Sequence, residues 1–236
     1  MHKLRVAQLN VEIDYKYETM TKQAEAYKSD FDKADIVVSA SDEAIEKMHE
    51  EYPHLSLNDC EYMLTGFIFY NKLLQYDGFM LHSSTVVLDN EAYMFSAPSG
   101  TGKSTHTQLW LKEFGDRAYI LNDDKPAIRF FEDGIYAYGT PWSGKTDQNV
   151  NKKVPVKAII FIERSENNYI EKMGVTETVK MLLYQGFRSR GKLGTENFLD
   201  MSEKIVNKIG VYKLGCNISR EAVMTVYNEI NGGKEK

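Results

Sequence analysis

A glycine-rich run that ends in lysine and serine is the part of the sequence with the clearest chemistry. Residues 97–104 read Ala-Pro-Ser-Gly-Thr-Gly-Lys-Ser, the pattern of a loop whose backbone amides surround phosphate groups. In such a loop the lysine contacts the β and γ phosphates and the final hydroxyl ligates Mg²⁺. We therefore expect ATP or GTP together with Mg²⁺, and Ser104 as a metal ligand. The residues expected to contact the nucleotide are Ser99, Gly100, Thr101, Gly102, Lys103, Ser104 and Thr105.

The same pattern occurs a second time, at residues 139–146 (Gly-Thr-Pro-Trp-Ser-Gly-Lys-Thr). A phosphate loop needs a strand that enters it and a helix that leaves it, because the helix supplies free amides and a favourable dipole. Only the first copy has both, with a predicted strand at Ala92–Ser96 and a predicted helix at Thr105–Phe114. We assign the nucleotide to the first copy.

The second copy is followed by loop-forming residues, and we expect it on the same face as Ser104. Trp142 and Lys145 are candidates to bind an acceptor or the transferred phosphate there. The alternative is a plain surface turn.

Two adjacent carboxylates end the next predicted strand, in the run Tyr119-Ile-Leu-Asn-Asp-Asp124. Adjacent residues of a strand point to opposite sides, so one carboxylate can face a metal while the other acts as a base. Asp124 is our candidate metal ligand, with Asp123 and Asp124 both candidate catalytic residues and their roles left open. The alternative is a solvated acidic turn. His82 becomes a candidate catalytic residue only together with this pair. Lys103 is the fourth candidate catalytic residue.

Two arginines, Arg188 and Arg190, could neutralise charge in a transition state. A solvated pair at a helix end is the alternative for them.

The elements that must position these residues form an α/β pattern. Residues 1–78 read as a small α+β portion with strands at Arg5–Ile13 and Ile36–Ser39, a helix opened by Ser41 or Asp42, and a helix from Leu57. In the last helix, a stripe at spacings of three and four predicts one buried face. The stripe consists of Tyr62, Met63, Phe67, Tyr70, Leu73 and Leu74.

Residues 79–236 read as the chemical domain, with the alternative that both portions form one continuous domain. Predicted hairpins lie at Ser84–Ser96 and Ile128–Tyr138, followed by an apolar strand at Val156–Glu163 that we expect in the centre of the sheet. The C-terminal third is predicted to be helical near 176–185, 196–209 and 219–230, with a strand at Val211–Leu214.

Composition excludes several classes of protein. A content of 42% hydrophobic and 27% charged residues is that of a globular chain. The formal net charge of −5 disfavours a nucleic-acid partner. The two cysteines have no metal-ligand spacing, and we find neither a secretory signal nor a membrane span, so we expect a cytoplasmic protein.

Taken together, His82 before a hairpin, the run 96–104 and Asn122-Asp123-Asp124 resemble the catalytic domain of HPr kinase/phosphorylase, and more distantly the phosphoenolpyruvate carboxykinases. The resemblance implies a P-loop kinase fold with a mixed, antiparallel-rich sheet. It also implies that one Asp activates a serine hydroxyl, with His82 orienting it and Ser104 helping to hold the metal. The family's N-terminal domain is absent here or replaced by residues 1–78.

The expected function is an ATP- and Mg²⁺-dependent kinase that phosphorylates a hydroxyl of a peptide or small molecule. The principal alternative is a nucleotide-sensing regulatory ATPase that acts through a protein partner. A carboxykinase-like lyase lacks identifiable extra metal ligands, and a helicase lacks a basic stripe. Homo-oligomer formation is left open.

Overall fold

The computed structural model describes residues 1–186 and 192–232 of the chain. The strands are β1 (His2–Val6), β2 (Leu9–Ile13), β3 (Ile36–Val38), β4 (Gly78–Met80), β5 (Ser83–Leu88), β6 (Glu91–Ser96), β7 (Ala118–Asp124), β8 (Ala127–Phe131), β9 (Gly134–Tyr138), β10 (Lys153–Arg164), β11 (Tyr169–Lys172) and β12 (Gly210–Cys216). The helices are α1 (Glu18–Gln23), α2 (Asp42–Glu51), α3 (Leu57–Leu73), α4 (Lys103–Phe114), α5 (Val175–Gln185), α6 (Lys192–Lys208) and α7 (Arg220–Asn231). Short 3-10 helices are η1 (Glu25–Tyr27), η2 (Leu74–Tyr76), η3 (Gly115–Arg117) and η4 (Gly144–Thr146).

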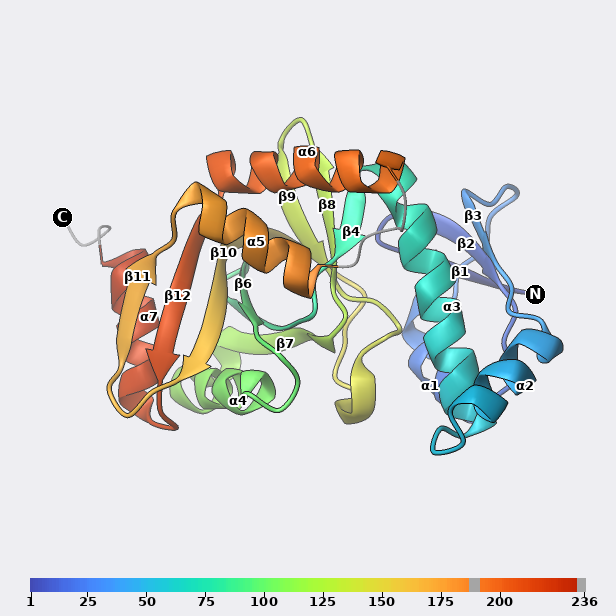
Figure 1. The fold of residues 1–236 in the computed structure, drawn as a ribbon, viewed down its shortest axis with the longest axis horizontal. Coiled ribbons are helices and arrows are strands. Elements are labelled where there is room, and N and C mark those ends of the chain that lie inside the picture. Colours follow the sequence, from blue (N-terminus) through green and yellow to red (C-terminus); the bar gives the residue numbers. More distant parts are fainter. Residues whose placement is uncertain (187–191, 233–236) are drawn as a thin grey trace.

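The N-terminal portion is a small sheet of order β1-β2-β3 beside the helices α1 to α3 (Figure 1). The prediction of one strand over Arg5–Ile13 was wrong, because Ala7 and Gln8 form a turn with φ of 51° and 63° between two antiparallel strands. This turn contains neither glycine nor proline, so the sequence carried no signal for it. The predictions also missed α1, β4 and β11.

The helix starts follow from capping side chains. Ser41 Oγ accepts a hydrogen bond from the Ala44 amide at 3.2 Å, which confirms the predicted start of α2. Ser56 and Asp59 form a capping box at the start of α3. Each cap satisfies amides that would otherwise lack a partner in the first helical turn.

The predicted buried stripe of α3 is only partly correct. Tyr62, Tyr70, Leu73 and Leu74 are buried, whereas Met63 and Phe67 are 44% and 57% exposed. A spacing of three and four residues fits two neighbouring ridges of a helix, and only one of these ridges packs into the core. Met63 and Phe67 belong to the ridge that faces an open groove, which is described below.

The large sheet has the strand order β4-β8-β9-β10-β6-β5-β7, with β12 also paired to β10 and β11 paired to β12. Strand β10 joins the two halves of this sheet. The first residues of β10 pair antiparallel with β9, and its later residues pair parallel with β6 and β12. The predicted α/β class, the mixed and antiparallel-rich sheet and the central place of the strand at 156–163 are therefore confirmed. The kinase type of this fold stays a prediction.

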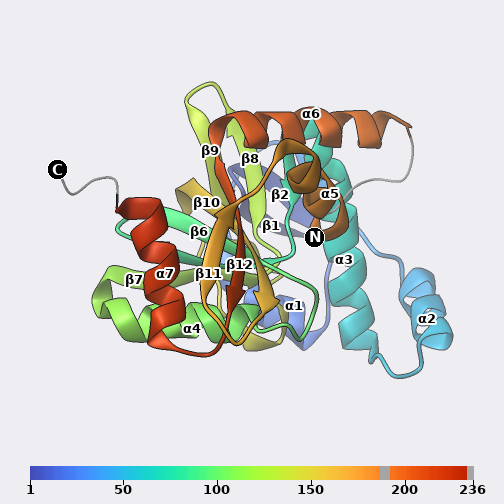
Figure 2. The ribbon, with the colours of Figure 1, turned by 60° about the vertical axis from the view of Figure 1, so that its left-hand side comes forward.

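Side-chain alternation along the strands gives the large sheet two buried faces. On β6, Met94 packs in the cluster that contains α5 and α6 residues, while Tyr93 and Phe95 pack in the cluster of α4 and α7. Figure 2 shows α4 and α7 together on one side of these strands, and α5 and α6 lying away from them. The sheet thus carries helices on both faces, and α4 is fixed directly behind the glycine-rich loop.

The N-terminal portion shares a core with the large sheet. Its hydrophobic cluster includes Ala127, Tyr138 and Trp142 from the other portion. The buried guanidinium of Arg129 on β8 donates to the carbonyls of Ala7 at 2.8 Å and of Tyr76 at 3.0 and 3.1 Å. In the described residues, no helix is both long enough and apolar enough to cross a membrane.

His106 provides a test of the core behind the loop. It is buried on α4 and accepts a hydrogen bond from Trp110 Nε1 at 3.2 Å, and burial lowers its pKa from 6.5 to about 4. The unfolded chain therefore binds a proton that the folded chain does not, so stability present above pH 6.5 is lost as pH falls toward 4.

We predict that the wild-type protein loses about 3 kcal/mol more stability between pH 7 and pH 4 than the variant His106→Gln. The measurement is urea unfolding of both proteins across this range. Parallel pH profiles for the two proteins would contradict the prediction.

Candidate functional site

Three strand ends meet at one edge of the large sheet. In the pairing of β5 with β6, Ser83 lies opposite Ser96, and in the pairing of β5 with β7 it lies opposite Asp124. Because paired strands lie about 4.8 Å apart, the start of the 97–104 loop and the acidic pair are held two strand spacings from each other. The register therefore brings together the loop, His82 and the two carboxylates that the sequence singled out.

The loop turns at two glycines whose backbone conformation other residues rarely adopt. Gly100 and Gly102 have φ of 78° and 121°, and the next residue, Lys103, begins α4. Ser104 follows in the first helical turn and is half-buried, and Thr105 beside it is exposed. The predicted strand-loop-helix arrangement is present in the structure.

Arg164 is a loop contact that the sequence predictions missed. Its guanidinium donates to the Gly100 carbonyl at 2.6 Å and to the Thr101 carbonyl at 3.3 Å. Arg164 ends β10, which runs parallel to β6, so the ends of both strands reach the same edge. An arginine directly after a central apolar strand was the available signal.

Lys103 faces the acidic pair. Its ammonium donates to the Ala97 carbonyl at 2.9 Å, and the side chain is buried. Burial lowers the pKa of Lys103, and the charges of Asp124 and Asp123 oppose that effect. Lys103 is therefore buried within the electrostatic reach of both carboxylates.

Asp123 is buried without a hydrogen-bond partner for its side chain. Its exposed fraction is 7%, and neither carboxylate oxygen has a partner among the residues that the structure describes. A buried carboxylate without a partner is costly, so such groups usually have a ligand or a catalytic role. Across residues 1–186 and 192–232, no group of three or more His, Cys, Asp or Glu side chains is arranged to hold a metal.

Asp124 has the opposite environment. Its Oδ1 lies 3.2 Å from His82 Nε2, and its Oδ2 is ion-paired with the Lys125 ammonium. The other ring nitrogen of His82, Nδ1, lies 3.2 Å from Gln185 Oε1. Burial raises the pKa of Asp124, but His82 and Lys125 outweigh burial and lower it to about 2. Asp124 is therefore an ionised carboxylate whose orientation is set by a histidine.

Asn122 fixes the backbone that carries this pair. Its Oδ1 accepts hydrogen bonds from the amides of Asp124 at 3.1 Å and Lys125 at 2.8 Å, and its Nδ2 donates to the Thr140 carbonyl at 2.9 Å. The side chain thus links the end of β7 to the second glycine-containing loop, at 139–146.

The second loop packs against Asp124, while its expected place on the same face as Ser104 stays a prediction. Gly144 has φ of 69°, and a Cβ added there would lie 2.9 Å from Asp124 Cβ. Trp142 is fully buried, and its ring centroid lies 4.8 Å from that of Phe69 in a stacked arrangement. Trp142 therefore packs this loop against α3. Lys145 is exposed. Ligand binding by Trp142 and Lys145 stays a prediction, and Arg188 and Arg190 lie outside the described residues.

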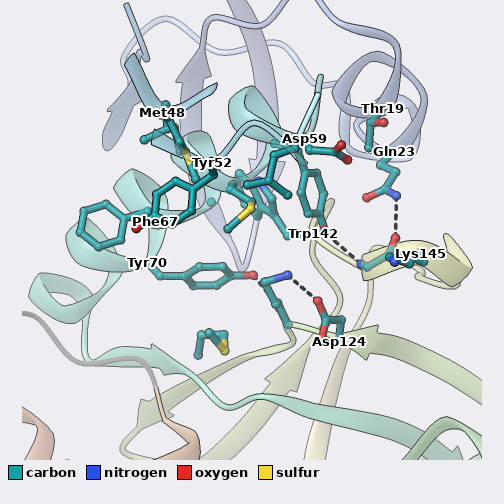
Figure 3. Close-up of a pocket in the computed structure, with 18 of the residues that line it drawn as sticks. Thr19, Gln23, Met48, Tyr52, Asp59, Phe67, Tyr70, Asp124, Trp142 and Lys145 are labelled. Carbon is teal, nitrogen blue, oxygen red and sulfur yellow. Dashed lines mark hydrogen bonds and ion pairs between the residues drawn. The ribbon is translucent and has the colours of Figure 1, made fainter. Parts of the chain in front are cut away.

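An open groove of about 1310 Å³ reaches this site from the N-terminal portion. Asp124, Lys125 and Lys145 line it, together with side chains of α1, α2 and α3. In Figure 3, Asp124 lies at one side of the groove and Met48, Tyr52 and Phe67 lie across it. Asp123 is buried and does not line the groove, so Asp124 is the carboxylate of the pair that opens onto it.

A smaller cavity of about 470 Å³ lies on the outer side of the glycine-rich loop. The loop residues from Pro98 to Thr101 form one wall, and Ile162, Glu163 and Arg164 at the end of β10 form the other. The residues of the glycine-rich loop line this cavity and do not line the groove.

Comparison with known proteins leaves the family undetermined. No protein-family model matches the chain, and no curated protein matches it. Among solved structures, the Hpr(Ser) kinase/phosphatase from Coxiella burnetii aligns with a TM-score of 0.40 and 13% identity, over 66% of this chain and 98% of that chain. A similarity at this level carries no functional argument, so the residues of the site must carry it.

We predict that Lys125→Met raises the pKa of Asp124 from about 2 toward its ordinary value of 3.8, because the ion pair favours the carboxylate form. The measurement is a titration of the aspartate carboxyl carbons by NMR. Lys145→Met is the matched control and leaves that pKa unchanged. An unaltered Asp124 titration in Lys125→Met would show that the ion pair does not set this pKa.

Proposed function

We propose that this protein is a kinase that uses Mg²⁺ and a nucleoside triphosphate, ATP in the first instance, to phosphorylate a hydroxyl group. The observation that carries the proposal is that the two adjacent carboxylates near Lys103 have different environments. Asp123 is buried and without a partner, whereas Asp124 is held by His82 and opens onto a groove. A kinase needs one carboxylate for the metal and another for the acceptor hydroxyl.

The phosphate end of the nucleotide belongs at the glycine-rich loop. Its amides and the N-terminus of α4 attract anionic phosphate, and Lys103 adds a positive charge. The cavity between this loop and Arg164 is the space that we assign to the nucleoside. Arg164 holds two loop carbonyls and so keeps them turned away from the phosphate position.

The residues present fit a magnesium ion that is bound together with phosphate. Mg²⁺ prefers oxygen ligands and in such sites uses one or two protein side chains, with phosphate and water completing the set. Asp123 supplies two unpartnered carboxylate oxygens, and Ser104 supplies a hydroxyl. When bound, the metal would neutralise charge on the phosphates. Our proposal therefore gives the metal to Asp123, where the sequence analysis had favoured Asp124.

Asp124 is the group that we assign to the acceptor. The acceptor oxygen forms a bond to the γ phosphorus, the bond from that phosphorus to the β–γ bridging oxygen breaks, and the hydroxyl proton passes to Asp124. The nucleoside diphosphate leaves with the electron pair. A carboxylate with a pKa of about 2 is a weak base, which suits a loose transition state in which the proton leaves late. His82 keeps the carboxylate in place.

We predict that Lys103→Met lowers phosphoryl transfer about 10²- to 10³-fold, because a preorganised charge on the phosphates is lost. The assay supplies γ-labelled ATP and a panel of serine peptides, sugars and small alcohols, and measures label on acceptor and in free phosphate. Lys112→Met, an exposed lysine of the same helix, is the matched control. Label that reaches only water with every acceptor would overturn the kinase proposal and favour a regulatory ATPase.

We predict different defects for the two aspartates. Asp123→Asn raises the Mg²⁺ concentration needed for half-maximal activity, because a metal ligand loses its charge. Asp124→Asn lowers kcat while nucleotide affinity and Mg²⁺ dependence stay at wild-type values. Magnesium titrations of both variants test this assignment, and the opposite pattern would return the metal to Asp124.

A further inference from the structure

We infer that the groove beside Asp124 binds the acceptor as a peptide segment, with a large apolar side chain next to the serine or threonine that is phosphorylated. This inference rests on the proposed kinase function and names the class of its substrate. The groove is continuous with the carboxylate that we assign to the acceptor hydroxyl, since Asp124 and Lys125 form part of its lining.

The size of the groove favours a peptide over a small molecule. Sites for small ligands usually enclose about 300–1000 Å³, whereas this groove has about 1310 Å³ and is open to solvent. Its walls come from elements far apart in the chain, from α1 to the 139–146 loop. A sugar or small alcohol would leave most of this surface uncovered.

The wall opposite Asp124 is apolar. Tyr52, Met63 and Phe67 are 48%, 44% and 57% exposed, and Met48 lies beside them. Figure 3 shows Met48, Tyr52 and Phe67 together, across the groove from Asp124. Clustered exposed apolar side chains next to a polar site typically mark a binding surface. Methionine side chains also adapt to different apolar partners.

Charge does not favour a strongly acidic or basic acceptor. The lining contains Lys22, Lys47, Lys125 and Lys145 and also Glu18, Glu51, Asp59, Asp124 and Asp147. Lys22 is paired with Asp147 at 2.8 Å, and Lys125 is paired with Asp124. The charges nearly cancel, so burial of apolar surface is the main source of affinity, and this contribution is insensitive to salt.

A peptide in the groove would present its hydroxyl to Asp124 while its neighbouring side chain covers Met63 and Phe67. The hydroxyl oxygen forms the bond to the γ phosphorus, the bridging oxygen leaves with the nucleoside diphosphate, and the proton passes to Asp124. The apolar contact is made away from the reacting atoms. It therefore affects binding of the peptide and leaves the nucleotide unaffected.

The test uses short glycine-alanine peptides with one central serine. One neighbouring position at a time is replaced by Phe, Leu, Lys or Glu, and free serine amide and glycerol serve as small acceptors. With γ-labelled ATP and the full chain, we expect Phe or Leu peptides to be phosphorylated roughly tenfold more efficiently than the unsubstituted, Lys or Glu peptides. We expect little change between about 0.05 and 0.5 M NaCl.

Groove variants complete the test. Met63→Ser and Phe67→Ala alter exposed side chains and should raise KM for the best peptide roughly tenfold, with KM for ATP unchanged. Tyr184→Ala removes an aromatic side chain that is 77% exposed and does not line the groove, and it should have no effect. Thermal unfolding checks that all three variants are folded.

The outcomes separate the two proposals. The inference is overturned if small acceptors are phosphorylated as efficiently as peptides. It is also overturned if peptide phosphorylation changes neither with the neighbouring residue nor with the groove variants. Both results leave the kinase proposal intact. Label that never reaches any hydroxyl overturns the kinase proposal, and the inference fails with it.

Discussion

Strand β5 lies between β6 and β7, and its register brings the start of the glycine-rich loop close to the acidic pair. Ser83 at its beginning is opposite both Ser96, which enters the glycine-rich loop, and Asp124, which ends β7. Since side chains alternate along a strand, a shift of this pairing by one residue would exchange the faces of Asp123 and Asp124. Val86, Val87 and Leu88 alternate between two hydrophobic clusters and fix one half of this pairing, and an irregularity between Thr85 and Val86 sets the register of the other half, which carries the acidic pair.

This register explains why two adjacent carboxylates can have different chemistry. Asp123 is buried and its side chain has no hydrogen-bond partner, so its two oxygens are available to a ligand. Asp124 is half-buried and lines the groove, where His82 and Lys125 lower its pKa to about 2. Asn122 accepts hydrogen bonds from the next two amides and so fixes the backbone between these environments. The difference between the carboxylates thus arises from the strand geometry and the local partners of each.

The N-terminal portion supports the site without contributing residues to the glycine-rich loop or the acidic pair. Helix α3 packs against Trp142 of the second loop, and that loop packs against Asp124 through Gly144. Gln23 of α1 also donates to the Gly144 carbonyl at 3.2 Å. Residues 1–78 therefore form one wall of the groove and hold the loop that touches Asp124, which connects this wall to the acidic pair.

The sequence by itself determined the local parts of the site. The glycines at 100 and 102, the strand before them and the helix after them are local features, because backbone conformation and hydrophobic periodicity depend on nearby residues. The second match at 139–146 could be separated from the first for the same reason. The α/β class and the central apolar strand also followed from local patterns.

Only the tertiary structure decided which residues become neighbours. Arg164 and Gln185 reach the site from distant strands and helices, and the roles of Asp123 and Asp124 depend on which face of β7 is buried. Met63 and Phe67 carry a periodicity typical of a buried helix face, yet they line a groove, because burial depends on whether another element covers that ridge. A helical pattern specifies which side chains share a face, and long-range packing decides whether that face meets the core, solvent or a ligand.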